Sequence, residues 1–329
     1  MKYWKRFFFS PFDPLPLAMF RMSLGLLILG AYLCLAPNWH DYYSDTGIGG
    51  PYIDWWSIFY FTNGIIPLNL FWWMAVAASI GFTLGYQTRV CTIILYILEF
   101  SMIHSNRMIA NGEDFTFRML LFYSCFTDLG KALSLDAWIK AKKQSLIAND
   151  SSTWPMAWPI RLMQINFALI YVISLPNKLA YDPAWLNGDA VYLSIVSNLW
   201  GRWPWPSLFY GGGLSQILTY LTLLAEGTFP VLVWFDKTRM YVIALVASLH
   251  LGIAVMLQNA TFFTLSMVAT LWIFIPGTML RGWMDKVFHQ GFSKLTVEEI
   301  PGPEIPLQKN IQRGAKVKPG RKMKERRRH

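Results

Sequence analysis

Long apolar stretches separated by short polar segments run along most of the chain. A helix needs about 20 apolar residues to cross the hydrocarbon core of a bilayer. Eight stretches approach or reach that length, and they lie near residues 16–36, 67–86, 90–104, 115–133, 160–178, 214–235, 240–257 and 262–276. The pattern predicts an all-α, polytopic membrane helical bundle with about eight transmembrane helices and apolar loops on the outer side.

Lysine and arginine are distributed unevenly between the polar segments, and this orients the predicted helices. Most of them precede the first stretch, follow the eighth, or lie between the second and third, fourth and fifth, and sixth and seventh stretches. The other side holds only Arg107, Lys178 and Arg202. Because Lys and Arg concentrate in cytoplasmic segments, we expect both termini in the cytoplasm and the protein in the plasma (bacterial inner) membrane. An alternative with seven spans would put the termini on opposite sides.

Two segments on the predicted outer side are long and rich in aromatic residues. They cover residues 39–67, with Trp55 and Trp56, and residues 178–213. Aromatic rings of this kind suit the headgroup region of a membrane. We expect the two segments to pack together over the mouth of the bundle, around a cavity open to the outer leaflet or to outer water.

The composition agrees with a membrane protein and excludes an ordinary soluble globule. Hydrophobic residues make up 54% of the chain, aromatic residues 16% and charged residues only 15%. The net charge of +10 does not indicate nucleic acid, because ten basic residues lie between Lys309 and Arg328 alone. Contact with anionic lipid headgroups, or a topology anchor, explains such a tail. The predicted partner is therefore the lipid bilayer, with no nucleic acid.

Two regions follow from this distribution: a transmembrane bundle over residues 1–276 and a basic, flexible cytoplasmic tail over 277–329. The tail is too polar to bury a core. The three cysteines, Cys34, Cys91 and Cys125, are odd in number and widely spaced in apolar runs. No disulfide framework and no metal site is expected from them.

Ionisable residues inside the apolar stretches are costly, so each is a candidate for function. They are Arg21, Glu99, Arg118, Asp128, Lys178, Glu226 and His250. Arg118 and Asp128 lie near opposite ends of one predicted helix, where long side chains can reach the interface. Arg21 is expected to pair with a carboxylate such as Asp13 or Asp128 in a structural role.

Lys178 is the first candidate for chemistry. It stands at the end of an apolar helix that Pro176 is expected to break, and a segment rich in Trp and Gly follows. That segment is too polar to span lipid and too apolar for an ordinary loop, which predicts a re-entrant or interfacial lid. A lysine that loses hydration there can give up its proton near neutral pH and act as a base. The structural alternative is a lysine that snorkels at the outer end of a span.

Glu226 and His250 lie within the sixth and seventh stretches. A carboxylate in the middle of a span must be protonated, paired or solvated, and its structural explanation is a helix-packing hydrogen bond beside Gly227. A histidine in a span is more often a satisfied core residue than a proton carrier. With Lys178, the two residues would form a proton-handling set on three neighbouring helices.

The order and spacing of several motifs resemble the HTTM (horizontally transferred transmembrane) family, which includes the membrane part of vitamin K-dependent gamma-carboxylase. The first motifs are Asp13-Pro14-x-Pro16-Leu17-x-x-Phe20-Arg21, Asn111-Gly112-Glu113-Asp114 with Arg118, and Ser134-Leu135-Asp136. The strongest is Arg161-x-x-Gln164, leading through Tyr171 to Lys178-Leu179, Trp185 and Gly188. Glu226, Pro230 and His250 with Phe263 complete the resemblance.

The resemblance implies roles for Lys178 and His250. Lys178 would be the base that deprotonates a quinol cofactor, a vitamin K-like hydroquinone, and His250 would position groups or stabilise charge. The implied activity is that of a carboxylase-like lyase or oxidoreductase. The carboxylases differ in carrying a large lumenal region after the spans, and they are more basic where this sequence has Pro176-Asn177 before Lys178.

A non-enzymatic function is the alternative, because the family also includes a bacterial maturation protein for a sporulation toxin that works with a partner. This chain would then be a membrane partner for the maturation or export of a secreted peptide or a small protein. A transporter is the weaker third interpretation, because neither an inverted repeat nor a pair of broken helices is evident in the sequence.

Overall fold

The computed structural model describes residues 2–44, 46–48, 55–62, 65–143, 154–204, 209 and 213–288. In these ranges the regular elements are helices, accompanied by two isolated β-bridges. The long helices are α2 (Pro14–Leu35), α5 (Leu68–Leu84), α6 (Thr88–Ser105), α7 (Gly112–Cys125), α9 (Trp158–Tyr181), α12 (Leu214–Leu232), α13 (Asp236–Met256) and α14 (Thr261–Thr270). The shorter ones are α1 (Lys2–Phe9), α3 (Trp39–Tyr43), α4 (Ile58–Phe61), α8 (Leu135–Lys143), α10 (Pro183–Asn187), α11 (Ala190–Val196) and α15 (Gly277–Phe288). The all-α prediction is confirmed.

Each of the eight predicted stretches contains a helix, but fewer of these helices are long and apolar enough to cross a membrane. In the described ranges three meet that condition: Pro14–Tyr43, Trp158–Tyr181 and Asp236–Met256. A fourth is added if Thr261–Phe274 and Gly277–Val287, which are bent by 104°, count as one span. Helix α7 has 14 residues and is therefore about 21 Å long, shorter than a hydrocarbon core of about 30 Å. The count of eight spans stays a prediction.

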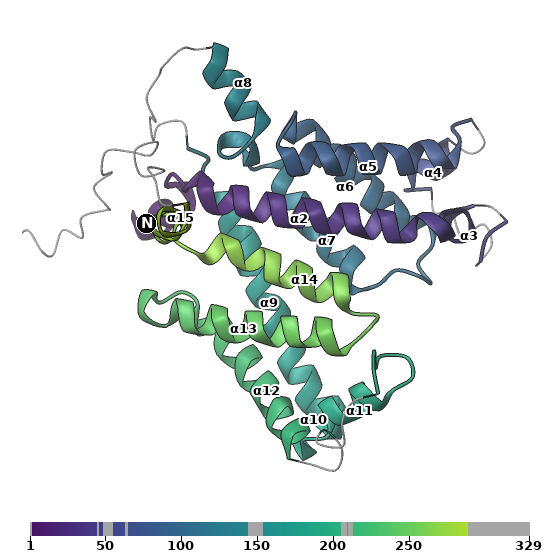
Figure 1. Cartoon of the computed structure of the whole chain (residues 1–329), viewed down its shortest axis with the longest axis vertical. Coiled ribbons are helices and arrows are strands. Elements are labelled where there is room, and N and C mark those ends of the chain that lie inside the picture. Colours follow the sequence, from purple (N-terminus) through teal and green to yellow (C-terminus); the bar gives the residue numbers. More distant parts are fainter. Residues whose placement is uncertain are drawn as a thin grey trace, which may run out of the picture.

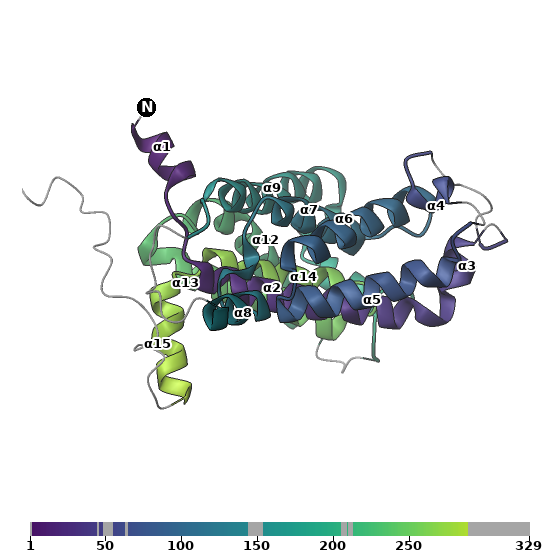
Figure 2. The same cartoon turned by 90° about the horizontal axis from the view of Figure 1, so that it is seen from above.

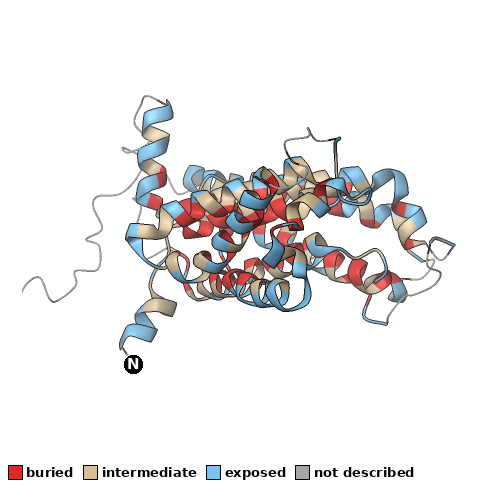
Figure 3. Ribbon diagram, turned by 90° about the horizontal axis from the view of Figure 1, so that it is seen from below, coloured by how far each residue is buried: buried red, intermediate tan, exposed pale blue. Residues whose placement is uncertain are grey.

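The long helices form one bundle with α2 near its centre (Figures 1 and 2). Helix α2 packs against α5 on one side and against α14 on another. Buried residues follow the inward sides of these helices, while exposed residues cover the outward sides (Figure 3). Exposed apolar side chains such as Leu26, Trp73 and Leu224 are expected on surfaces that face lipid.

An aromatic cluster joins α9 and α12 to the segment that follows α14. Its members are Phe167, Tyr171, Phe229 and Phe274, with ring centroids between 5.1 and 5.9 Å apart. All four are buried. Aromatic pairs at such separations add to the stabilisation from burial alone. The cluster therefore fixes how α9 and α12 face each other, and both helices carry candidate site residues.

Arg21 is fully buried in α2, but it does not pair with a carboxylate as predicted. Its guanidinium donates hydrogen bonds to three backbone carbonyls beyond the end of α7, those of Leu129 (2.9 Å), Ala132 (3.3 Å) and Leu133 (2.5 Å). Helix α7 ends at Cys125, well before residue 133, where the apolar stretch ends. The freed carbonyls are the partners that Arg21 uses, whereas Asp13 and Asp128 pair with other residues.

Asp13 pairs with Arg281, which lies near the other end of the chain. The Arg281 guanidinium donates two hydrogen bonds to the Asp13 carboxylate, at 2.5 and 2.9 Å. Asp13 also accepts from the backbone N–H of Leu15, at 3.0 Å, and so caps α2. Arg281 belongs to α15, so the first twelve residues of the predicted tail form a helix fixed to the start of α2. Residues 289–329, with the basic run after Lys309, lie outside the described residues.

The short helices gather at the ends of the bundle. Both views place α1, α8 and α15 at one end and α3 and α4 at the other (Figures 1 and 2). The predicted packing of the two aromatic outer segments against each other is wrong for their described parts. Helices α3 and α4 lie far from α10 and α11 along the longest axis of the molecule (Figure 1). Each pair instead packs on its own helices, α5 and α6 in one case and α9 and α12 in the other.

Candidate functional site

One face of α9 carries the residues around which the site is built. Tyr171, Ser174 and Lys178 are spaced by three and four residues, so they lie above one another on the helix surface. The helix continues to Tyr181, which corrects the prediction that Pro176 breaks it. A proline inside a helix removes one backbone hydrogen bond, and packing against neighbouring helices makes this tolerable in membrane proteins. Lys178 therefore projects from a regular helix.

Lys178 contacts Glu226 of α12. The Lys178 Nζ donates to one oxygen of the Glu226 carboxylate, and the Ser174 hydroxyl donates to the other at 3.3 Å. The side chain of Lys178 is 22% exposed and that of Glu226 is 8% exposed. The ion pair is therefore largely withdrawn from solvent, with its amine on the more open side. Both carboxylate oxygens have a donor from α9.

Two short helices, α10 and α11, follow α9, and a side chain of α10 covers the amine. Trp185 in α10 places its ring 4.4 Å from the Lys178 Nζ, a cation–π contact. The Asp182 carboxylate caps α10 by accepting from the Ala184 N–H at 3.0 Å. The Tyr220 hydroxyl of α12 donates to the Leu186 carbonyl at 3.0 Å. These contacts hold the Trp185 ring over the amine and fasten the covering segment to α12.

His250 joins the same region from α13 through Tyr171. Its Nε2 lies 2.8 Å from the Tyr171 hydroxyl, and which of the two donates depends on the imidazole tautomer. Both residues are buried, and the other ring nitrogen of His250, Nδ1, has no hydrogen-bond partner. Lys178 thus contacts Glu226 directly, whereas His250 contacts Tyr171, which lies two turns before Lys178 on α9.

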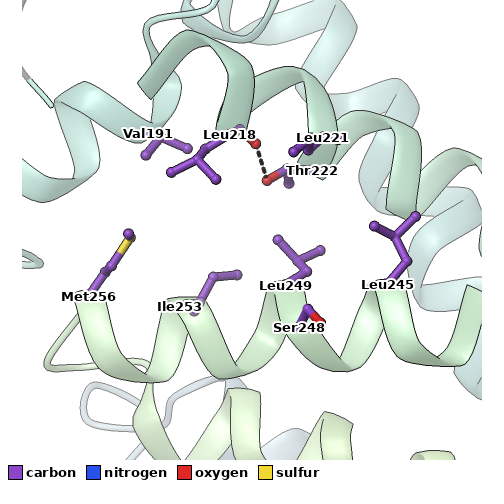
Figure 4. Close-up of a pocket in the computed structure, with 10 residues that line it drawn as sticks. Val191, Leu218, Leu221, Thr222, Leu245, Ser248, Leu249, Ile253 and Met256 are labelled. Carbon is purple, nitrogen blue, oxygen red and sulfur yellow. Dashed lines mark hydrogen bonds between the residues drawn. The ribbon is translucent and has the colours of Figure 1, made fainter. Parts of the chain in front are cut away.

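An apolar pocket lies beside this site, between α11, α12 and α13 (Figure 4). Its volume is about 180 Å³. The lining residues are Val191, Leu218, Leu221, Thr222, Leu245, Ser248, Leu249, Gly252, Ile253 and Met256. Thr222 precedes Glu226 by one helical turn and Leu249 is adjacent to His250, so the pocket neighbours the polar site along two helices.

Comparison with protein-family models matches the HTTM domain over residues 9–278, which is most of the chain. The chain belongs to the HTTM family. The resemblance read from the motifs is confirmed. No curated protein and no solved structure matches this HTTM protein.

Several matched motifs of this HTTM protein serve its fold. Asn111 and Asp114 form a capping box that starts α7, in which the Asn111 N–H donates to the Asp114 carboxylate at 2.7 Å. Asp136 accepts from the backbone N–H groups of Gln87 (2.8 Å) and Thr88 (2.9 Å) and so caps α6 from a distant segment. Carboxylates at helix N-termini satisfy free N–H groups and oppose the helix dipole. The Lys178 motif is different, because its charged group pairs with a carboxylate in the middle of another helix and caps no helix end.

The other predicted candidates lie away from Lys178 in this HTTM protein. Glu99 is buried in α6 beside Tyr32 of α2, and one of its oxygens has no hydrogen-bond partner. Arg118 lies over the Phe115 ring at 5.2 Å. Asp128 is half exposed, and its carboxylate lies 3.9 Å from the Lys131 Nζ. In the described part of the chain no group of three His, Cys, Asp or Glu residues could hold a metal ion.

Arg202, one of the few basic residues on the predicted outer side, has a structural role. It donates to the backbone carbonyls of Ala254 (3.2 Å) and Leu257 (2.8 Å) and to the Thr261 hydroxyl. It therefore caps the C-terminus of α13 and ties the segment after α11 to the α13–α14 turn. Ser174 is not among the residues that the sequence singles out, and Tyr171 is named there only as part of the family motif. Their spacing from Lys178 was the available signal.

Proposed function

We propose that this HTTM protein is a multi-pass membrane enzyme that transfers protons on a lipid-soluble, amphipathic substrate, with Lys178, Glu226 and His250 as the proton-handling residues. The proposal includes the eight-span topology in a plasma membrane with both termini in the cytoplasm. The observation that carries it is the ion pair of Lys178 and Glu226. Withdrawing two opposite charges from solvent costs desolvation free energy that can exceed the gain from their attraction. Stability alone therefore does not account for this pair.

The pair offers a route to a neutral amine without net charge separation. Transfer of one proton from Lys178 to Glu226 converts an ammonium and a carboxylate into an amine and a carboxylic acid. Burial penalises charged groups more than neutral ones, so this neutral state is accessible in such an environment. The Lys178 amine can then accept a proton from a substrate hydroxyl. The ammonium that forms stands beside the new oxyanion and stabilises it.

Trp185, Tyr171 and His250 complete the proposed site. The Trp185 ring covers one side of the amine. Exclusion of water there would strengthen the electrostatic interaction between Lys178 and Glu226. The Tyr171–His250 hydrogen bond is a second polar pair, two helical turns before Lys178 along α9. His250 would there stabilise charge or exchange a proton through Tyr171.

A quinone or hydroquinone is the cofactor class that the family resemblance implies, and the residues present fit it. The site offers a cation and a carboxylate for a phenolic oxygen, an indole ring at 4.4 Å from the amine, and an apolar pocket nearby. When bound, a hydroquinone would supply reducing electrons and a phenolic proton. Lys178 would hold that proton and Glu226 would hold the amine in place.

Loss of a hydroquinone to dioxygen in proteoliposomes tests the proposal. Positioned general bases contribute about 10²–10⁴-fold to a rate, so Lys178→Ala should lower the rate by about 100-fold or more. Lys237→Ala, which removes an exposed lysine at the start of α13, is the matched control and should leave the rate unchanged. Equal rates in Lys178→Ala and in the unchanged protein would refute a role of this amine in the reaction.

A non-enzymatic partner function is the second proposal, and exposed aromatic residues support it. Trp55 and Trp56 are each more than half exposed, and their rings stack with centroids 3.7 Å apart. Exposed aromatic residues are typical of binding surfaces. If a secreted peptide binds there, Trp55→Ala with Trp56→Ala should abolish its recovery with the purified protein, while Lys178→Ala should retain it. Recovery that depends on neither change would count against this function.

A further inference from the structure

The pocket beside the site is a wedge formed by two diverging helices. Helices α12 and α13 are joined by a short turn and spread apart toward α10 and α11 (Figure 1). Helix α11 closes the open end, where the Val191 N–H donates to the Thr219 hydroxyl of α12 at 3.1 Å. Along α13 the lining residues run from Leu245 to Met256, a length of about 16 Å at the rise of an α-helix. The pocket is therefore elongated along α13.

The chemistry of the pocket wall fits hydrocarbon. Aliphatic side chains and a methionine face each other across the gap (Figure 4). The two polar side chains, Thr222 and Ser248, are uncharged, and the Thr222 hydroxyl donates to the Leu218 carbonyl of its own helix at 2.9 Å. A polar ligand would lose its hydration here and gain little in return. An apolar ligand would gain by leaving water or by replacing loosely packed lipid.

Gly252 indicates that the space is kept open for an occupant. It lies inside α13, where glycine is less favourable than alanine. A Cβ atom at this position would meet no other atom within 4 Å. By contrast, a Cβ at Gly25 of α2 would collide with Thr83, so that glycine is required by helix packing. Packing does not require glycine at 252, and the absent side chain leaves the middle of the pocket wide.

We infer that this pocket binds the single hydrocarbon chain of an amphiphilic ligand whose head lies at Glu226 and Lys178, which rests on the proposed function. Thr222, in the pocket wall, and Glu226, in the polar site, are one turn apart on α12. The polar head would then lie about one helical turn from the pocket wall along α12. The volume of about 180 Å³ is below the roughly 300–1,000 Å³ of sites for drug-sized molecules, which favours a slender chain over a fused ring system.

Photolabelling with a fatty acid that carries a diazirine in mid-chain tests this inference. In nanodiscs the unchanged protein should be labelled on peptides from α12 and α13. Gly252→Leu fills the pocket from the position where a side chain meets no atom, and should lower that labelling by about fivefold or more. Gly282→Leu is the matched control, because a Cβ at Gly282 of α15 also meets nothing within 4 Å. It should be labelled like the unchanged protein.

The melting temperature of Gly252→Leu distinguishes a blocked pocket in folded protein from a misfolded protein. Gly252→Leu should melt within about 2 °C of the unchanged protein or above it, because leucine is a better helix former. Equal labelling of the two variants in folded protein, or labelling confined to other helices, would overturn the inference. Competition distinguishes the sources of the chain: displacement by a short isoprenoid quinone assigns an isoprenoid chain, and displacement only by a lysophospholipid assigns an acyl chain.

The two proposals can fail separately. Lys178→Ala leaves the pocket wall intact, so it should be labelled normally even where turnover is lost. Normal labelling together with unchanged turnover in Lys178→Ala would support the pocket and remove the proposed chemistry. Loss of turnover in Lys178→Ala, with undiminished labelling of Gly252→Leu, would leave the chemistry and remove the pocket ligand.

Discussion

At the scale of single residues, buried charges in this protein have two kinds of partner. Arg21 and Arg202 donate to backbone carbonyls at helix ends, and these interactions hold segments in place. Lys178 and Arg281 donate to carboxylates, those of Glu226 and Asp13, and each of these interactions joins two ionisable groups. A carbonyl cannot accept a proton near neutral pH, whereas a carboxylate can. Because an arginine guanidinium stays protonated in proteins whereas a lysine can lose its proton, Lys178 is the one of these four cations that is suited to proton transfer.

Removal of Lys178 should destabilise the protein through the charge left on Glu226. Breaking a buried ion pair costs about 3–5 kcal/mol, and the partial exposure of Lys178 lowers our expectation for Lys178→Met to about 2 kcal/mol. The double change Lys178→Met with Glu226→Gln removes both charges and should recover most of the loss. Chemical unfolding in one detergent measures this. Additive losses in the double variant would show that the two residues do not interact.

Arg21→Gln should be more damaging than Arg118→Gln, the same change at the other arginine among the candidate residues. It removes donors from three carbonyls, and each unsatisfied buried group costs about 1–3 kcal/mol, so we expect a loss of about 3 kcal/mol or more. Arg118→Gln should change stability by less than about 1 kcal/mol, because the Arg118 guanidinium lies over one exposed ring. Thermal unfolding of both variants in the same detergent gives the comparison.

At the scale of elements, the ends of the helices are set by local caps and by groups from distant parts of the chain. Asp13 caps α2 from the position before its first residue. Asp136 caps α6, and Arg202 caps α13 at its C-terminus, from distant segments. A helix in lipid has no water to satisfy its terminal groups. Capping residues therefore decide where these helices begin and end, and they account for several of the family motifs.

Arg202→Gln should loosen the end of α13 without changing the ion pair. The change removes the charged donors to the last carbonyls of α13, so we expect a loss of about 1–2 kcal/mol. Hydrogen exchange of residues 254–261 should become faster, while exchange in the middle of α9 stays slow. Lys237→Gln at the exposed start of α13 is the control. Unchanged exchange in residues 254–261 would show that the cap does not hold this turn.

The sequence predicts the elements better than their contacts. Apolar runs are enough to predict a helix in each of the eight stretches, because burial in lipid or protein requires such runs. The partners of Arg21 could not be predicted, since backbone carbonyls have no signature in the sequence. Pro176 predicts a helix break, but tertiary packing overrides its local effect in α9. Lys178, Glu226 and His250 stand out as ionisable residues in apolar runs. Ser174 is uncharged and has no such signal, and Tyr171 is marked only by its place in the family motif.

At the scale of the whole molecule, contacts between the two ends of the described chain bear on topology. Asp13 at the start of α2 binds Arg281 in α15, so these two points lie on the same side of any membrane that the bundle crosses. Helices α3 and α4 lie at the opposite end (Figure 2). This arrangement agrees with an even number of crossings between Asp13 and Arg281, which the proposed eight-span topology requires.

Single-cysteine labelling should show that sidedness directly. After replacement of Cys34, Cys91 and Cys125, cysteines at Trp4 and Trp283 should react with an impermeant maleimide only after the membrane is opened. A cysteine at Trp56 should react in intact cells, because the positive-inside rule places that end outside. All three positions are exposed, so access is not limited by folding. Labelling of the cysteines at positions 4 and 283 from different sides would contradict both the Asp13–Arg281 contact and the eight-span topology.

The bond between Asp13 and Arg281 has a consequence for biogenesis. The two residues are 268 positions apart, so a ribosome must complete nearly all of the bundle before the first transmembrane helix gains its ion-pair partner. Until then Asp13 has no guanidinium beside it, and an incomplete chain exposes that carboxylate at the membrane surface. Closure of this contact thus requires synthesis of the bundle through α15.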